Sequence, residues 1–268
     1  MRTALAQFAP RLADKEANLA LMIDYMKEAK KQQADVIVFP ELGLTGYSVG
    51  EQLDVIAETL DGPSIQRLQT ECRKNGIAAV VSFPERNGNR FHISAVWITE
   101  NGTRAGVYRK THLFSTEKNY FTPGQEWPVV ETRFGRIGMM ICYDLEFPEV
   151  ARLLRLNGAE MIVVNTANMV PYQRYQQVFM QSRAMENEIP LVICNRLGQE
   201  GDLEFFGDSM AVDHEGNILL HMGQEEGVQS VDVRLDSARD PALNYAGNLH
   251  PLIRSNLLNH LKSETKQS

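Results

Sequence analysis

Short apolar runs rich in β-branched residues alternate along this chain with segments whose apolar residues recur at helical spacing. The runs include "VIVF" at residues 36–39, "GMMIC" at 138–142 and "MIVVN" at 161–165. Such runs are typical of strands that are buried on both faces. The alternation favours a layered α/β fold over a β-sandwich or a helical bundle. The helical segments follow Asp14, run from Pro63 to Gly76, open at Pro148 and end by Gly158, and cover residues 173–187.

The middle of the chain adds a series of hairpins. The runs "IAAVVSFPE", "HISAVWIT" and "GTRAGVYRK" are joined by the turn sequences "NGN" and "ENG". Two sheets covered by outer helices fit these hairpins better than one doubly wound sheet does. Because no low-complexity linker interrupts the chain, we expect one domain over residues 1–240. Residues 241–268 form a tail with a short helix near 252–262, and its run "NYAGNLHPLIR" is apolar enough to pack on a neighbouring subunit.

Composition excludes several classes of function. The net charge is −7 and the basic residues are scattered, which argues against a nucleic-acid partner. No apolar run reaches the roughly 18 residues that a membrane helix needs, and no signal-peptide core is visible. The three cysteines are Cys72, Cys142 and Cys194, far apart in the chain, so we expect a reduced, cytoplasmic protein. No spacing of His and Cys suggests a zinc site, and we expect neither metal nor cofactor.

Three predicted strands end in chemically reactive residues. They end at Glu41, Lys110 and Cys142. Functional groups gather at the carboxyl ends of strands in α/β sheets. If these strands are neighbours with matching ends, a carboxylate, an ammonium group and a thiol converge. Taken singly, each residue has an ordinary alternative, as a turn residue, a surface charge or a buried packing residue.

The residues around these strand ends favour the functional interpretation. Gly43 and Gly46 permit a tight loop after Glu41. Cys142 begins a strand-to-helix turn, which exposes a side chain and leaves backbone N–H groups free. Three carboxylates follow it closely, and like charge raises the pKa of a thiol. Any activation of Cys142 must therefore come from elsewhere in the chain; the three acids are Asp144, Glu146 and Glu149.

The motifs "FPELGLTGY", "YRKTHLF" and "ICYDLEFPE", with "TANMVPY" and "RAMEN" after them, resemble the nitrilase superfamily of carbon–nitrogen hydrolases. The resemblance runs from residue 1 to about residue 235 and keeps the order of the family's motifs. It implies a four-layer αββα sandwich that pairs into an αββααββα dimer. Among branches, the chain is most similar to short bacterial aliphatic amidases, and closest to the 5-aminopentanamidase type.

The resemblance implies hydrolysis of a linear carboxamide to a carboxylic acid and ammonia through a thioester. Cys142 is then the nucleophile and Glu41 the general base. Lys110 stabilises the oxyanion together with the backbone N–H of Tyr143, and its charge favours the thiolate. Glu117, seven residues after Lys110, is the second glutamate of the family and holds that lysine. Its alternative is an exposed acid on a loop.

Substrate preference follows from a departure from one branch of the family. Branches that cleave N-carbamoyl amino acids have two arginines just after the nucleophile, whereas this chain has Leu145 and Glu146. An acid there repels an anionic substrate, so we expect a neutral or cationic aliphatic amide. The alternative is that Glu146 makes only structural contacts. By motif position, Tyr47, Asn168 and Tyr172 are expected to bind substrate as well.

Other functions remain open at this stage. A thiol also adds to nitriles, so a nitrilase is one alternative, and an acyltransferase that passes the thioester to an amine is another. A non-catalytic binding or scaffold protein of the same fold is a third. A Cys–His protease pair with His112 is disfavoured, because no protease signature surrounds Cys142. We expect His112 to give structural support, Asp144 to brace the turn, and Glu149 to lie in the first helical turn.

Overall fold

The computed structural model describes residues 1–235, 240 and 242–263. The predicted domain boundary lies between residues 240 and 241, and residue 241 is outside the described residues. The last five residues of the predicted tail, 264–268, are also outside them. The boundary therefore remains a proposal.

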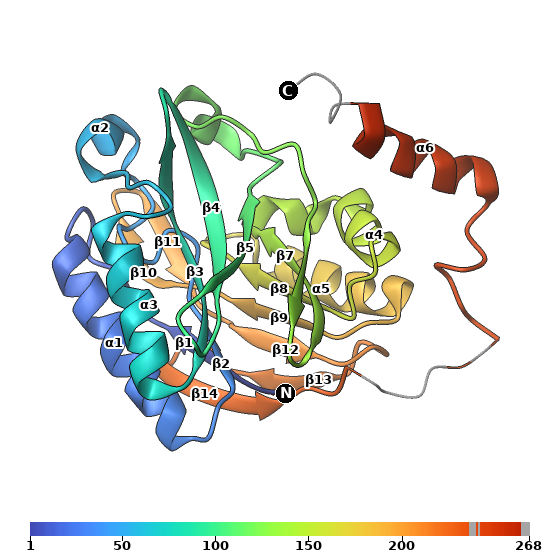
Figure 1. Ribbon diagram of the computed structural model, residues 1–268, viewed down its shortest axis with the longest axis horizontal. Helices are drawn as coiled ribbons and strands as arrows, with labels where there is room; N and C mark the ends of the chain where they lie inside the picture. The colour runs from blue at the N-terminus through green and yellow to red at the C-terminus, as the bar shows by residue number, and fades with distance from the viewer. Residues whose placement is uncertain (236–239, 241, 264–268) are drawn as a thin grey trace.

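Two six-stranded mixed sheets form the centre of the molecule (Figure 1). The first has the order β14-β1-β2-β3-β4-β5, made of Gly227–Asp232, Arg2–Gln7, Val36–Val38, Ala78–Asn87, Arg90–Ile98 and Arg104–Arg109. The second has the order β13-β12-β9-β8-β7-β6, made of Ile218–His221, Met210–Val212, Leu191–Cys194, Met161–Asn165, Gly135–Ile141 and Val129–Thr132. Each sheet is parallel at its centre and antiparallel towards its edges.

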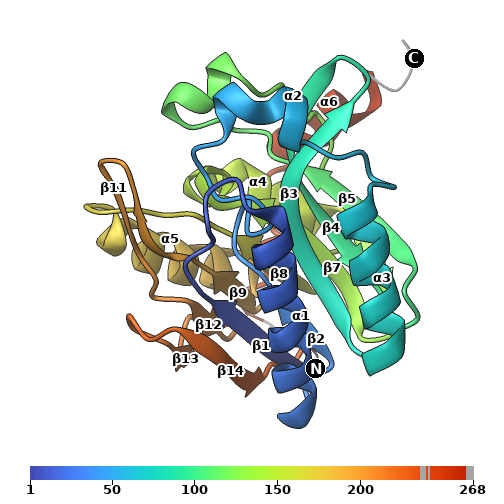
Figure 2. The same ribbon diagram turned by 90° about the vertical axis from the view of Figure 1, so that its left-hand side faces the viewer.

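Helices cover the outer face of each sheet, which gives four layers (Figure 2). Helices α1 (Lys15–Lys31) and α3 (Pro63–Asn75) pack on the first sheet, and α4 (Pro148–Leu156) and α5 (Gln173–Asn187) pack on the second. Three apolar clusters fill the gaps between layers, one under each helical layer and one between the sheets. The predicted αββα sandwich is confirmed.

The predicted helix boundaries are confirmed by their capping contacts. The side chain of Asp14 accepts a hydrogen bond from the backbone N–H of Ala17 at 3.1 Å. Pro63 and Pro148 open α3 and α4, where a missing N–H costs nothing. Gly76 ends α3 in the left-handed conformation, with φ of +59°.

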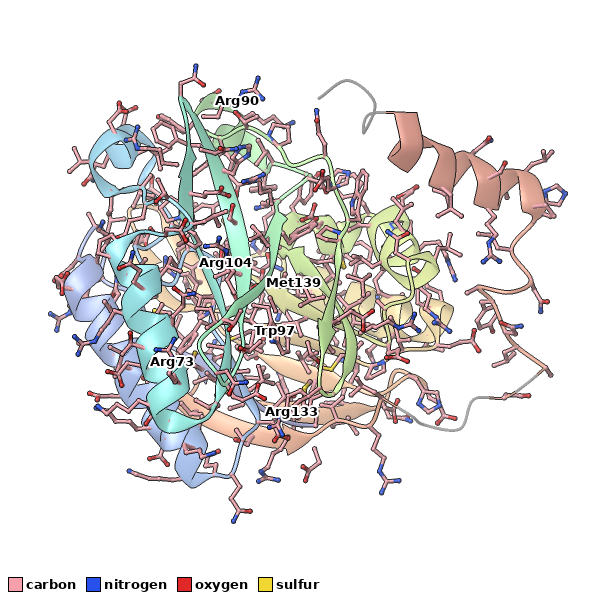
Figure 3. The ribbon with its side chains drawn as sticks, in the orientation of Figure 1. Arg73, Arg90, Trp97, Arg104, Arg133 and Met139 are labelled. Atoms are coloured by element: carbon pink, nitrogen blue, oxygen red, sulfur yellow. The ribbon has the colours of Figure 1, made fainter. Side chains whose placement is uncertain are left out.

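The cluster between the sheets contains large side chains from both of them. Trp97 of β4 and Met139 of β7 are both buried there, and both are labelled in Figure 3. A separate two-stranded sheet, β10 (Leu197–Glu200) with β11 (Leu203–Phe206), is connected to the second sheet through β9. The remaining elements are short helices and a tail helix: η1 (Gly50–Gln52), α2 (Leu53–Ile56), η2 (Ser115–Asn119), η3 (Cys142–Glu146) and α6 (Pro251–Ser263).

Helix α6 confirms the helix predicted near residues 252–262. It lies at the periphery in Figure 1, on the side of α4. Its apolar residues Leu252 and Ile253 are 68% and 52% exposed. This helix therefore presents apolar surface to solvent in a single chain.

Candidate active site

Glu41, Lys110 and Cys142 converge, but from two different sheets. Glu41 follows β2 and Lys110 follows β5, and β3 and β4 separate those strands in the first sheet. Cys142 follows β7 of the second sheet. The three strands are therefore not neighbours, although the sequence predicted convergence on the condition that they were. The two sheets face each other, and the loops beyond their strand ends bring the three side chains together.

Lys110 is buried between two carboxylates. Its Nζ donates to Oε1 of Glu41 at 2.7 Å and to Oε1 of Glu117 at 2.8 Å. Burial alone would lower the pKa of this lysine, but Glu117 and Glu41 outweigh burial and hold its pKa well above the ordinary value. Lys110 is therefore a fixed positive charge at the centre of the cluster.

Glu41 is fully buried and is held at both carboxylate oxygens. Its Oε2 accepts the backbone N–H of Ala167 at 3.0 Å, while Oε1 accepts from Lys110. Burial, opposed by Lys110 and reinforced by Glu117, raises the pKa of Glu41 to about 7. A carboxyl group with that pKa exchanges protons readily near neutral pH, as a general base must.

Cys142 begins the turn η3 in a strained conformation, with φ of +45°. Burial of the thiol and the nearby Glu41 raise its pKa far above the ordinary range, whereas Lys110 and a hydrogen bond with Thr166 lower it. Lys110 lowers the pKa of the thiol, as the sequence predicted, but burial and Glu41 raise it by more. The resting group is therefore a neutral thiol, and its proton must leave as the sulfur attacks.

Glu117 is a buried anchor, and the exposed-loop alternative is wrong. Its Oε1 accepts from Lys110 and, at 2.6 Å, from the hydroxyl of Tyr47. Its Oε2 accepts the backbone N–H of Phe114 at 2.7 Å. Three donors of this kind hold both oxygens of the carboxylate in place.

Asp144 braces the nucleophile turn, as predicted. Its buried carboxylate accepts the backbone N–H of Ile141 at 3.2 Å and the hydroxyls of Tyr108 and Thr111 at 2.8 Å. It also contacts His112, whose ring stacks on Phe147 with centroids 3.8 Å apart. His112 thus supports the turn from the side. His112 and Lys110 both lie beyond the end of β5, in the segment that follows it.

A pocket opens over Cys142, with about 420 Å³ of unfilled space including its open mouth. Glu146, Asn168 and Tyr172 line it, as the sequence had suggested, and so does Tyr143, which was predicted only as a backbone donor to the oxyanion. Tyr47 is not among its lining residues. Sequence reasoning missed a largely apolar set that also lines it, although some of these residues lie inside the quoted motifs: Phe114, Leu145, Thr166, Met169, Gln176, Phe179 and Ile193.

The described part of the chain contains no group of three or more His, Cys, Asp or Glu side chains placed to hold a metal ion. Over the same residues, none of the helices combines the length and the apolar character that crossing a membrane requires.

A thiol held by a strained turn beside a glutamate and a lysine, in an αββα sandwich, defines a class of cysteine-dependent hydrolases. The sequence model of the carbon–nitrogen hydrolase family matches residues 2–241. The chain belongs to this family, and it is an enzyme of the nitrilase superfamily. The binding-protein alternative is therefore set aside.

Individual relatives agree with this assignment. The chain is 37% identical over 246 residues to an (R)-stereoselective amidase of Pseudomonas sp., covering 91% of this chain and 89% of that protein. It is 34% identical over 242 residues to a nitrilase of Pyrococcus abyssi, covering 88% and 91%.

A solved structure is similar over almost the whole chain. An amidase from Nesterenkonia sp. superimposes with a TM-score of 0.84 at 31% identity, covering 96% of this chain and 95% of that one. A glutamate-to-glutamine variant of that amidase shows covalent addition of the acetamide moiety of fluoroacetamide at its active-site cysteine.

Thiol labelling tests the environment of the cysteines. In the folded protein we expect iodoacetamide to modify Cys142 alone, because Cys72 and Cys194 have no exposed surface. The rate should rise with pH, because burial keeps the thiol protonated. Peptide mapping identifies the site, the Cys142→Ala protein is the control, and denatured protein should gain three labels. Labelling of Cys194 before Cys142 would contradict this arrangement.

Proposed function

We propose that this chain is an amidase that hydrolyses a linear carboxamide to a carboxylic acid and ammonia. The observation that supports this most directly is the buried cluster of Glu41, Lys110, Glu117 and Cys142 beside an apolar pocket. An amide carbon is a weak electrophile, and a covalent thioester divides its hydrolysis into two easier steps. Relatives with similar sequences and folds are named as amidases.

In the first step, the sulfur of Cys142 attacks the amide carbon as its proton passes to Glu41. The carbonyl oxygen becomes negative, and the ammonium of Lys110 with the backbone N–H of Tyr143 stabilises it. Glu41 then returns the proton to the amide nitrogen. The carbon–nitrogen bond breaks, ammonia leaves, and the acyl group remains on Cys142 as a thioester.

In the second step, Glu41 takes a proton from a water molecule, and the water attacks the thioester carbon. The carbon–sulfur bond breaks, the carboxylic acid is formed, and the proton returns to the sulfur. Glu117 keeps the ammonium of Lys110 in place throughout, because both its oxygens are occupied by donors.

Kinetics on an aliphatic amide tests this mechanism. Because Glu41 must be ionised and its pKa is raised to about 7, kcat/KM should fall about tenfold per pH unit below that value. Glu41→Gln should lower kcat by about 100- to 10,000-fold. Cys142→Ala should form no acyl adduct by intact mass, and the exposed Glu16→Gln should match the wild type.

Three outcomes would contradict the proposal. Hydrolysis by Cys142→Ala at the wild-type rate excludes the thioester. Ammonia release from a nitrile but not from its amide indicates a nitrilase. An acyltransferase is indicated if the acyl group passes to added hydroxylamine faster than to water, by more than the difference in intrinsic reactivity between the two nucleophiles.

The substrate is proposed to be a neutral or cationic aliphatic amide, as in the 5-aminopentanamidase branch. Glu146 lines the pocket and is partly buried. Burial raises its pKa, and Arg183 opposes that rise. The aromatic rings of Phe114, Tyr143 and Tyr172 also line the pocket, and such rings attract a cation at their faces. An ammonium group at the far end of a substrate would therefore meet complementary charge.

Exchange of one oxygen tests the role of Glu146. We expect Glu146→Gln to lower kcat/KM for 5-aminopentanamide about tenfold and to leave kcat/KM for butyramide within about twofold. The matched control is Glu149→Gln, an exposed acid three residues along. Equal losses on both substrates would show that Glu146 has a structural role. Faster cleavage of an N-carbamoyl amino acid than of either amide would exclude the proposed class.

We propose further that the chain forms a homodimer through the outer face of α5, with residues 241–268 as a tail near that interface. Tyr175, Val178 and Met185 recur at helical spacing on α5, and they are 51%, 47% and 52% exposed. An apolar stripe of this kind is typical of a protein interface. The apolar residues of α6 give a second surface for the same purpose.

Sedimentation velocity tests the dimer. The wild type should sediment as a dimer at micromolar concentration, and Val178→Glu should shift it towards the monomer because a charge at an apolar interface is costly. Val55→Glu is the control, since Val55 is 87% exposed on α2. A monomeric wild type, or a Val178→Glu protein that remains a dimer, would contradict the proposed surface.

A further inference from the structure

The hairpin of β10 and β11 touches the loop that follows Glu41. This hairpin stands outside the two main sheets (Figure 2). Its residue Glu200 is buried, and its carboxylate faces the backbone of the loop. Oε2 accepts the N–H of Ser48 at 2.8 Å and the N–H of Tyr47 at 3.1 Å, and Oε1 accepts the N–H of Tyr47 at 3.2 Å.

A buried cation accompanies this carboxylate. Arg196 has 1% of its side chain exposed and forms a very short ion pair with Oε1 of Glu200. A buried ion pair is a weak source of stability, because both charges lose their hydration. What such a pair provides is a fixed geometry, and here Glu200 fixes two consecutive N–H groups of the loop.

The same pair also fixes the ring of Tyr47. The guanidinium of Arg196 lies 4.0 Å from the ring centroid of Phe205, on β11. Phe205 in turn meets the ring of Tyr47 edge to face, with centroids 5.7 Å apart. Tyr47 is therefore held by its backbone through Glu200 and by its ring through Phe205.

Gly46 permits the close approach of the loop to the carboxylate. Its φ is +82°, and a Cβ at this position would lie 2.9 Å from Oε1 of Glu200. Any larger residue would thus push the loop and the carboxylate apart. The glycine that the sequence suggested for a tight loop serves this contact.

The hydroxyl of Tyr47 connects this assembly to the catalytic cluster. It donates to Oε1 of Glu117 at 2.6 Å, the same oxygen that accepts from Lys110 at 2.8 Å. We infer that Glu200 is a positioning residue for the proposed amidase reaction, acting through Tyr47 to hold Glu117 on Lys110. The inference rests on the proposed function, because it concerns the lysine assigned there to the oxyanion.

The hydroxyl affects how Lys110 divides its charge between two carboxylates. With Tyr47 in place, Oε1 of Glu117 has two donors, and Lys110 also bonds Glu41 at 2.7 Å. Without the hydroxyl, Lys110 is the remaining donor to that oxygen, and Glu117 draws the ammonium towards itself. Glu41 then keeps its proton to a higher pH, because the ammonium of Lys110 has moved away while the other titratable groups near Glu41 stay in place. Those groups are Glu117, Cys142 and Arg196.

Removal of one hydroxyl tests the inference. Tyr47→Phe should lower kcat about 10- to 100-fold, the size expected for one hydrogen bond to a charged group, and change KM less than threefold. The acid limb of its kcat/KM profile should move to higher pH. The control is Tyr25→Phe, which removes a tyrosine hydroxyl bonded to Glu226 at 3.1 Å, away from the cluster.

A double-mutant cycle tests the part played by Glu200. Glu200→Gln should lower kcat and move the acid limb in the same direction. The kcat of the Tyr47→Phe/Glu200→Gln protein should be only slightly lower than that of the less active single variant, because both changes break one chain of contacts. If Glu200→Gln fails to fold, since Arg196 is left unpaired, Glu200→Gln with Arg196→Met gives the same cycle without a buried charge.

Each outcome decides between the possibilities. Tyr47→Phe at the wild-type rate, an unmoved acid limb, or losses that add fully in the cycle would overturn the inference. An unmoved limb with equal losses in thermal stability would mean that the hairpin is only structural. An inactive wild type without an acyl adduct would instead refute the proposed function.

Discussion

A lysine ammonium with no exposed surface is costly in a protein, and two glutamates make it possible here. Lys110 donates to Glu41 and to Glu117, and both of those carboxylates are themselves buried. Removing Lys110 would leave two buried carboxyl groups without their shared donor, and removing either glutamate would take one of its two acceptors from a buried ammonium. The surrounding loops are therefore constrained to deliver all three together. Much of the local structure, including the backbone donors to Glu41 and Glu117, serves that requirement.

The balance of charge also determines how the nucleophile works. Two carboxyl groups and one ammonium lie near Cys142, whose thiol is partly buried beside them. A permanent thiolate would add a further negative charge there, so the thiol is kept neutral. A base with a pKa near 7 then matters more than a pre-formed anion, and the raised pKa of Glu41 meets that need. The strained turn at Cys142 contributes direction rather than charge.

The sequence predicted much of the fold and the members of the cluster, for identifiable reasons. Buried strands and capped helices follow from periodicity and from residues such as Pro63 and Gly76, and the motifs identify Glu41, Lys110 and Cys142. Two points could not be read from local patterns. The pairing of strands into separate sheets depends on contacts distant in sequence. The orientation of Tyr47, expected in the pocket, depends on a carboxylate about 150 residues later, at Glu200.

The origin of the cluster in two facing sheets has a mechanical consequence. Glu41 and Lys110 belong to one sheet and Cys142 to the other, so the distance between base and nucleophile is set by the thickness of the apolar layer between them. Side chains such as Trp97 and Met139 are spacers in that sense, and neither lines the pocket over Cys142. Closely packed interiors transmit small changes in volume over such distances. The packing of the hydrophobic core between the two sheets therefore determines the distance between Glu41 and Cys142 in the active site.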